Sequence, residues 1–330
     1  MHCDICCTLP ENNTLYIVTV INNPLQWHSR YSLAREAILG WLKEPNVHVT
    51  VVEVAHGDRS HCLCDLECGE YADRVQHIRV YAKTMAWSKE NCINLGISQL
   101  PREAKYIGTF DADVDWRKPG WASQIVHYLN LYPVVQPWQT CYDLGPHDEH
   151  IQAHTSFAYV YFNGKPVIRK DIACWNYYGG KYDFPHPGYA WAWTRGALDG
   201  FGGLFELGGM GSGDHHMALA LVGMAGHSLP KDCGPVYMEA VEIWEKRAIR
   251  TINYKLGYVP LTIEHKWHGD KRRRGYLTRW GIFVKHGFDP ISDLRRNAWG
   301  VLEFDGNKPE LEREFDCYLR SRQEDANIIA

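Results

Sequence analysis

The chain has 330 residues, of which 45% are hydrophobic, 13% aromatic and only 22% charged. This composition excludes a disordered or low-complexity protein and provides for one large core or two closely packed ones. A net charge of −4 excludes a globally basic coat for nucleic acid, although a local basic patch is compatible with it. The sequence has no apolar run of about 18 residues, the length that a membrane helix needs, and residues 1–14 lack the apolar core of a signal peptide. We therefore expect a cytoplasmic protein without a membrane span.

The eleven cysteines agree with a reducing compartment, because their number is odd and the chain is not small. Six of them form two clusters: Cys3, Cys6 and Cys7, and then Cys62, Cys64 and Cys68. His56 and His61 are close in sequence to the second cluster, so a structural zinc ion with ligands from both clusters is one interpretation. Neither cluster has the paired CxxC spacing, and reduced thiols are the other interpretation.

The first half of the chain opens with the strand–helix–strand order of an α/β sheet. Residues 15–21 (LYIVTVI) form a continuous apolar run, typical of a buried parallel strand, and the turn signal NNP follows at 22–24. Residues 31–42 place apolar side chains on one helical face, and residues 47–54 (VHVTVVEV) predict the next strand. This order predicts an α/β sheet.

Further elements follow in the same half. In chain order we expect an irregular loop at 55–77, a short strand at 77–80, a helix at 88–100 capped by Ser88, a strand at 105–110, a helix at 120–131 and a strand at 134–137. In the second half, residues 157–162 and 165–169 predict a hairpin around the Asn-Gly pair at 163–164, and residues 215–223 predict a helix.

The chain shows no internal repeat and no linker, so we expect a single domain over 1–330. We expect it to divide into a nucleotide-binding half at 15–135, an acceptor-binding and catalytic half at 136–290, and a C-terminal helical, charged extension at 291–330.

Three carboxylates follow the predicted strand at 105–110, namely Asp111, Asp113 and Asp115. Carboxylates this close together are costly unless a cation neutralises them. In an open α/β sheet ligands bind beyond the carboxyl ends of the strands, where a divalent cation held by carboxylates and substrate phosphates would fit. A DxD triplet alone favours an exposed acidic turn; its place after the third predicted strand favours the metal site.

Glycine and aromatic residues gather at 186–193 (HPGYAWAW), 201–206 (FGGLFE) and 211–216 (GSGDHH). Glycine lets a ligand approach the backbone closely, and Trp and Tyr offer flat faces that stack on a sugar ring. Asp214 precedes an apolar helical segment. It could cap that helix, or it could be a general base that takes a proton from an acceptor hydroxyl, and the local sequence favours neither role.

A third group of candidates lies at 264–276 (EHKWHGDKRRRGY). His265 and His268 are three residues apart, as metal ligands can be, and the basic run at 271–274 can bind phosphates. Ordinary surface histidines and a solvated basic face are the alternative.

In this order the segments resemble glycosyltransferases of the GT-A fold, most closely the β-1,4-galactosyltransferase type and related glycosyltransferase-like proteins of phages. The resemblance covers about residues 15–280 and implies a Rossmann-like α/β fold with a mixed, mostly parallel sheet flanked by helices. It implies that Asp111 and Asp113 match the DxD motif of the family and that Asp214 matches its catalytic acidic residue. The pair Asp113 and Asp115 could replace the first pair as the metal ligands.

The same resemblance implies the remaining site residues. The late metal-binding histidine of the family matches His265 or His268. Nucleotide or cofactor contacts are expected from Thr19, Asn22, Asn23, Glu53, Lys89, Asn94, Asp111, Lys271 and Arg274. Sugar and acceptor contacts are expected from His186, Gly188, Tyr189, Trp191, Gly202, Gly203, Glu206 and Gly213. Mn²⁺ or Mg²⁺ would be the metal and a UDP-sugar the donor.

The resemblance implies an inverting transfer of a hexose to a hydroxyl acceptor, either a glycan or a hydroxymethylated base of phage-type DNA. Asp214 would take the proton of the acceptor, the metal would stabilise the leaving UDP, and residues 271–274 would close over the phosphates as a mobile lid. This chain departs from the family in having one acid within GSGDHH, where the family has an acidic cluster, and in lacking the family's secretory anchor. A phage-encoded protein acting in the host cytoplasm would fit.

Two other classes of protein stay open at this point. One is a nucleotide-sugar or carbohydrate-binding protein without catalysis, which needs only the aromatic cleft. The other is a zinc-containing nucleic-acid-binding protein, which needs the cysteine clusters. The sequence leaves the sugar, the acceptor and the oligomeric state undetermined.

Overall fold

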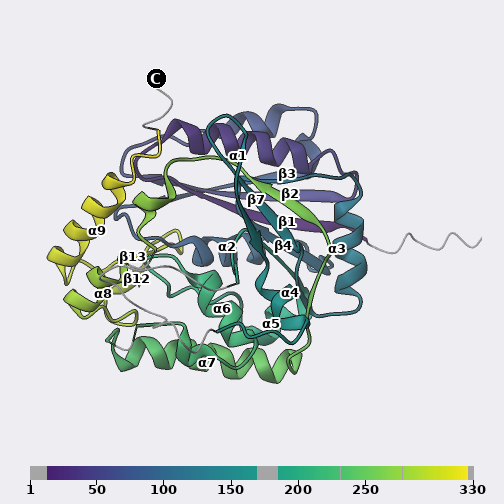
Figure 1. The fold of residues 1–330 in the computed structure, drawn as a ribbon. Helices are drawn as coiled ribbons and strands as arrows, with labels where there is room; N and C mark the ends of the chain where they lie inside the picture. Colours follow the sequence, from purple (N-terminus) through teal and green to yellow (C-terminus); the bar gives the residue numbers. More distant parts are fainter. Residues whose placement is uncertain (1–12, 169–184, 231, 277, 326–330) are drawn as a thin grey trace, which may run out of the picture.

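The computed structural model describes residues 13–168, 185–230, 232–276 and 278–325. Its centre is a seven-stranded sheet with the order β10-β6-β9-β4-β1-β2-β3 (Figure 1). The strands are β1 (Leu15–Asn22), β2 (Val47–His56), β3 (Val75–Ala82), β4 (Tyr106–Phe110), β6 (Val134–Gln136), β9 (Ala190–Thr194) and β10 (Leu256–Tyr258). Neighbouring strands run parallel except at β9, which is antiparallel to both β4 and β6. The predicted α/β class, with a mixed and mostly parallel sheet flanked by helices, is confirmed.

Helices cover both faces of this sheet, with α1 on one side and α2, α5, α6 and α7 on the other (Figure 1). The helices are α1 (His28–Trp41), α2 (Lys89–Ser98), α3 (Trp121–Leu129), α4 (Phe157–Phe162), α5 (Arg195–Phe201), α6 (Gly213–Leu221), α7 (Pro235–Ile252), α8 (Trp280–His286) and α9 (Pro309–Ser321). Successive side chains of a strand point to opposite faces. Ile17 of β1 therefore packs in one core with Ile38 of α1, and Val18 packs in a second core with Ile93 of α2.

A second sheet, with the order β5-β11-β7-β8, connects distant parts of the chain near the end of β4. Its strands are β5 (Val114–Trp116), β7 (Thr140–Leu144), β8 (His150–Thr155) and β11 (Thr262–His265). β11 pairs antiparallel with β5 and parallel with β7, and this register sets His265 beside Val114 and Asp143. The pairing thus brings a residue from late in the chain to the carboxylates that follow β4.

The C-terminal part contains α8, the short antiparallel pair β12 (Leu294–Arg296) and β13 (Leu302–Phe304), and α9. Within the expected extension at 291–330, the described residues contain β12, β13 and the helix α9. Beyond α9 the chain returns to the start of α1, where the carboxylate of Asp325 accepts hydrogen bonds from the backbone N–H groups of His28 at 2.7 Å and Ser29 at 3.0 Å.

The predicted hairpin at 157–169 is wrong, because its first arm is the helix α4. Ser156 caps this helix, its Oγ accepting a hydrogen bond from the N–H of Tyr159 at 3.2 Å. Phe157 is buried, and the ring of Tyr159 meets that of Tyr258 edge-on at 5.0 Å. The aromatic composition favours a strand, but the cap and these tertiary contacts favour a helix. The end of the second arm lies outside the described residues.

The other predicted elements described below differ from the observed ones mainly at their ends. The strand expected at 77–80 is the longer β3, and the loop before it contains two short 3₁₀ helices, η1 (Cys64–Cys68) and η2 (Ala72–Arg74). Ser88 does precede α2, but its side chain makes no capping hydrogen bond. None of the helices in the described ranges combines the length and the apolar character needed to cross a bilayer.

Candidate active site

A cavity of about 460 Å³ opens where β1 and β4 end. Its lining includes these predicted site residues: Asn22, Lys89, Asp111, Asp113, His186, Gly188, Tyr189, Asp214, His265, His268, Lys271 and Arg274. All three groups of candidates, from the DxD segment, the glycine- and aromatic-rich segment and the late basic segment, therefore meet in one place.

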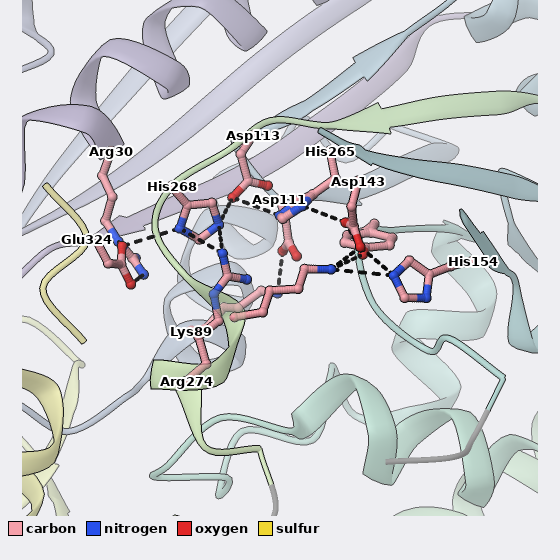
Figure 2. A network of polar contacts seen from close by, with 12 residues as sticks. Arg30, Lys89, Asp111, Asp113, Asp143, His154, His265, His268, Arg274 and Glu324 are labelled. Atoms are coloured by element: carbon pink, nitrogen blue, oxygen red, sulfur yellow. Dashed lines mark hydrogen bonds and ion pairs between the residues drawn. The ribbon is translucent and has the colours of Figure 1, made fainter. Parts of the chain in front are cut away.

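Asp113, His265 and His268 form the centre of this site (Figure 2). Oδ2 of Asp113 lies 3.6 Å from Nε2 of His265 and 2.9 Å from Nε2 of His268. One ligand atom from each of the three residues lies within 4.8 Å of the other two. Within the described parts of the chain no other group of His, Cys, Asp and Glu side chains has a comparable geometry.

The hydrogen bonds around the two histidines fit a bound cation. Nδ1 of His265 lies 2.9 Å from Oδ1 of Asp143, and Nδ1 of His268 lies 3.3 Å from Oε2 of Glu324. An ionised carboxylate can only accept, so with a cation bound each Nδ1 would keep its proton for the carboxylate beside it, and each Nε2, which faces Asp113, would offer its lone pair to the cation. Oδ1 of Asp113 is buried and has no hydrogen-bond partner among the described residues. Two nitrogen lone pairs and a carboxylate facing one another are a suitable ligand set for a divalent cation.

The pKa shifts of these three residues also agree with a site for a cation. Burial alone would raise the pKa of Asp113, but His265 and His268 hold it well below its usual range. Burial lowers the pKa of His265, yet Asp113 and Asp143 outweigh burial and raise it to about 9. Burial and the Arg274 guanidinium lower the pKa of His268. A cation bound at Asp113 would therefore displace a proton from His265.

Asp143 in β7 supports His265 from behind. Its Oδ1 accepts hydrogen bonds from His265 and, at 2.8 Å, from the hydroxyl of Tyr189, while its Oδ2 contacts His154 and the ammonium of Lys271 (Figure 2). Burial opposes ionisation, but these donors hold the pKa of Asp143 far below its usual range. One buried carboxylate thus links the metal group, a cation of the basic run and the aromatic wall of the cavity.

Asp111 lies apart from the three-ligand group and forms an ion pair with Lys89 (Figure 2). Burial would lower the pKa of Lys89, but Asp111 raises it above its usual range. The adjacent Glu90 is 3% exposed and lines the cavity. Burial and the nearby Asp214 outweigh the lowering effect of Lys89 and together raise the pKa of Glu90 to about 7.

Asp214 lines the cavity from the first turn of α6. Ser212 occupies the N-cap position, and Oδ1 of Asp214 accepts a hydrogen bond from the N–H of His215 at 2.8 Å. A Cβ atom at position 188 would lie 2.7 Å from Oδ2 of Asp214, so Gly188 leaves room for this carboxylate. Asp214 therefore presents an anion to the cavity at a helix end that favours negative charge.

Cations line much of the remaining cavity. They are Arg30, Lys89, Lys271, Arg272, Arg274, Arg279 and Arg322. The guanidinium groups of Arg30 and Arg322 lie 5.1 and 5.3 Å from the ring centroid of Trp87, and Nη2 of Arg279 donates to Oγ of Ser212 at 2.6 Å. Such a lining favours an anionic ligand.

The other predicted contact residues do not line the cavity. They are Thr19, Asn23, Glu53, Asn94, Trp191, Gly202, Gly203, Glu206 and Gly213. Thr19 donates to the carbonyl of Phe110 at 2.8 Å, Glu53 accepts from two backbone N–H groups after β2, and Glu206 pairs with Arg296. These side chains hold segments of the protein together, and their contact with a ligand stays a prediction.

The alternative ligand sets find less support. Asp115 lies in β5 and belongs neither to the cavity lining nor to the three-ligand group. Cys62, Cys64 and Cys68 are exposed free thiols, and among the described residues none of them joins a three-ligand group. Cys3, Cys6 and Cys7 lie outside the described residues.

Several lining or supporting residues escaped prediction from the sequence. They are Arg30, Trp87, Glu90, Asp143, His154, Arg279, Arg322 and Glu324. Asp143 left a signal in the sequence, because it is an acid within the otherwise uncharged run TCYDL. An acid that such a strand buries needs partners. Glu324 left none, because its contacts with Arg30 and His268 join segments that are far apart in the sequence.

The chain matches no protein-family model, and no curated protein matches its sequence. Among solved structures it is similar to TarS 1-349 of S. aureus, with 8% identity and a TM-score of 0.40, over 95% of this chain and 74% of that chain. It is similar to a mannosyltransferase of Pyrobaculum calidifontis in complex with GDP-Man and Mn²⁺, with 15% identity and a TM-score of 0.45, over 93% and 72%. TarS 1-349 in complex with UDP-GlcNAc matches with 7% identity and a TM-score of 0.41, over 93% and 72%. At these identities the likeness concerns the arrangement of the chain alone.

Proposed function

We propose that this protein is a metal-dependent glycosyltransferase of the GT-A type, which moves a hexose from a nucleoside diphosphate sugar, expected to be a UDP-sugar, to a hydroxyl acceptor. The observation that carries the proposal is the group Asp113, His265 and His268, with its unpartnered carboxylate oxygen, in the same cavity as Asp214. A cation site supports binding of a diphosphate, and a separate carboxylate supports deprotonation of an acceptor.

The donor would be held at the metal end of the cavity. The metal, Mn²⁺ or Mg²⁺, would be held by Asp113, His265 and His268. It would stabilise the negative charge of the departing diphosphate. Lys271 and Arg274 lie close enough to this group to bind phosphate oxygens, since Lys271 contacts Asp143 and Nη2 of Arg274 lies 2.9 Å from Nε2 of His268.

The acceptor would be activated by Asp214. Its carboxylate would take the proton of the acceptor hydroxyl as that oxygen attacks the anomeric carbon, while the bond from this carbon to the diphosphate oxygen breaks. Attack opposite the leaving group would invert the anomeric configuration. A glycan and a hydroxymethylated DNA base are both acceptors with such a hydroxyl.

Release of nucleoside diphosphate from a panel of UDP- and GDP-sugars, with and without Mn²⁺, tests the proposal. We expect slow Mn²⁺-dependent hydrolysis of one donor, loss of this activity in Asp113→Asn, and retention of it in Asp115→Asn. The Asp115 variant is a matched control, because it removes a carboxylate two residues away that does not line the cavity.

Two results would count against the proposal. The absence of any donor hydrolysis together with the absence of metal-dependent UDP binding would contradict it outright. Metal-dependent binding without turnover, even after acceptors have been supplied, would instead indicate a nucleotide-sugar-binding protein.

A further inference from the structure

The chain segment after α9 reaches the metal end of the cavity. Glu324 is 3% exposed, and its Oε2 lies 3.3 Å from Nδ1 of His268 (Figure 2). The same carboxylate forms a two-point ion pair with Arg30 of α1, at 2.5 and 3.0 Å, and contacts Arg322 at 2.5 Å. Arg30 and Arg322 line the cavity, so Glu324 connects two cavity cations to a metal-ligand candidate.

Contacts on both sides fix the position of Glu324. The next residue, Asp325, accepts hydrogen bonds from the backbone N–H groups of His28 and Ser29 and, at 2.6 Å, from the hydroxyl of Ser29. The loop after His268 packs on the backbone of Glu324, because a Cβ atom at Gly269 would lie 3.0 Å from the Cα atom of Glu324. Segment 322–325 is thus held against α1 and against the loop that carries His268.

The contact with Glu324 favours Nε2 of His268 as the ligand atom. With a cation bound, Nε2, which lies 2.9 Å from both Oδ2 of Asp113 and Nη2 of Arg274, would be the ligand, and the Nδ1–H group would donate a hydrogen bond to Glu324. Without Glu324, the ring could turn or carry its proton on Nε2, which cannot then bind a cation. His265 has an equivalent partner in Asp143, so each imidazole of the group is backed by one buried carboxylate.

We propose that Glu324 is a positioning residue for His268 and that segment 322–325 is a built-in part of the cation site. The inference rests on the proposed function in one respect, namely that Asp113, His265 and His268 bind a divalent cation. It adds that the cation affinity of the site depends on Glu324, a carboxylate that follows His268 by 56 residues.

The test is the Mn²⁺ dissociation constant of the purified protein, measured from the electron paramagnetic resonance signal of free Mn²⁺. Loss of an outer carboxylate partner weakens metal binding by about 10- to 100-fold, so we expect this change in Glu324→Ala. Asp316→Ala is the control, because it removes a carboxylate of α9 that pairs with Arg320 and belongs neither to the cavity lining nor to the three-ligand group. This variant should bind Mn²⁺ within about twofold of the wild type, since its change lies outside segment 322–325 and outside the histidine contacts.

A spectroscopic readout separates positioning from a merely structural role. The visible absorption bands of bound Co²⁺ should shift in Glu324→Ala and stay unchanged in Asp316→Ala, because only the first variant alters a ligand's orientation. Mn²⁺ affinity and Co²⁺ spectrum equal to those of the wild type in a folded Glu324→Ala protein would overturn the inference and leave the proposed function intact. A wild-type protein that binds no Mn²⁺ would overturn both.

A measurement on the wild type covers the case in which Glu324→Ala fails to fold. In the Zn²⁺-loaded protein, ¹⁵N chemical shifts of His268, assigned by comparison with His268→Gln, should show a protonated Nδ1 and a metal-bound Nε2. A metal-bound Nδ1 with a protonated Nε2 would overturn the inference.

Discussion

The two ends of the cavity are built in different ways. At the metal end, Asp143 and Glu324 each support one histidine through a buried carboxylate. At the other end, the hydrogen bond found for Asp214 among the described residues comes from the N–H of its own neighbour, His215. A site that must hold an ion gains from a rigid, fully bonded surrounding, whereas a base must keep an oxygen free for the incoming proton. This contrast agrees with the proposal that the metal end binds the cation and the donor diphosphate, while Asp214 at the other end takes the proton of the acceptor.

Substitution of Asp214 should separate the two ends most strongly. We expect Asp214→Asn to lower the transfer rate by about 10²- to 10⁴-fold, the usual contribution of a general base, and to leave Mn²⁺ affinity within about twofold. Transfer kinetics with the donor found in the hydrolysis panel and a Mn²⁺ titration would measure both. Equal losses of rate and of Mn²⁺ affinity would show that the two ends act as one.

Removal of Asp143 should destabilise the metal end. Asp143→Ala leaves Lys271 and His265 without their buried partner, and breaking a buried ion pair costs about 3–5 kcal/mol of unfolding free energy. Urea denaturation at pH 7 would measure the change. The control, Asp316→Ala, removes an exposed pair with Arg320 and should cost less than about 1 kcal/mol. Similar small losses in both variants would show that the Asp143 network contributes little.

Glu90 gives a pH-dependent contrast at the Asp214 end. Because burial raises its pKa to about 7 from 4.5, the folded state holds its proton longer than the unfolded state does, and stability falls as the pH rises from about 4.5 to 7. We expect Glu90→Gln to raise the unfolding free energy by about 3 kcal/mol at pH 8 and to have no effect near pH 4. Urea denaturation across this range would reveal the trend, and a pH-independent difference between the two proteins would contradict it.

The cysteines should matter least. Cys62→Ser and Cys64→Ser change exposed thiols outside the three-ligand group, so we expect Mn²⁺ affinity within about twofold of the wild type and unchanged metal content after dialysis. Metal analysis by mass spectrometry measures the second quantity. Loss of a tightly bound zinc ion in either variant would support the zinc interpretation instead.

A feature could be predicted from the sequence when the residues that determine it lie close together in the chain. The run at 15–21 and the DxD segment after the strand at 105–110 carry their signals locally, so the sheet and the place of Asp113 could be predicted. The helix α4 could not be predicted, because contacts with distant residues, such as that of Tyr159 with Tyr258, favour a helix where the local composition favours a strand.

The supporting carboxylates show the same limit. Asp143 reaches His265 only through the pairing of β7 with β11, and Glu324 reaches Arg30 across almost the whole chain. The glycine-rich segment at 201–206 was expected to contact the sugar, but its residues do not line the cavity. Its Glu206 contacts Asn91, Asn94 and Arg296 instead of the cavity, and nothing in its local sequence distinguishes the two outcomes.

The central claim is that Asp113, His265 and His268 hold the divalent cation that the donor requires. A Mn²⁺ titration of the wild type and of Asp113→Asn, with and without UDP, tests it most directly. We predict one Mn²⁺ per wild-type chain, tighter binding in the presence of UDP, and a loss of at least about 100-fold in affinity in Asp113→Asn, a change of about 2.7 kcal/mol. Equal Mn²⁺ binding by the two proteins, or no binding by either, would contradict the account.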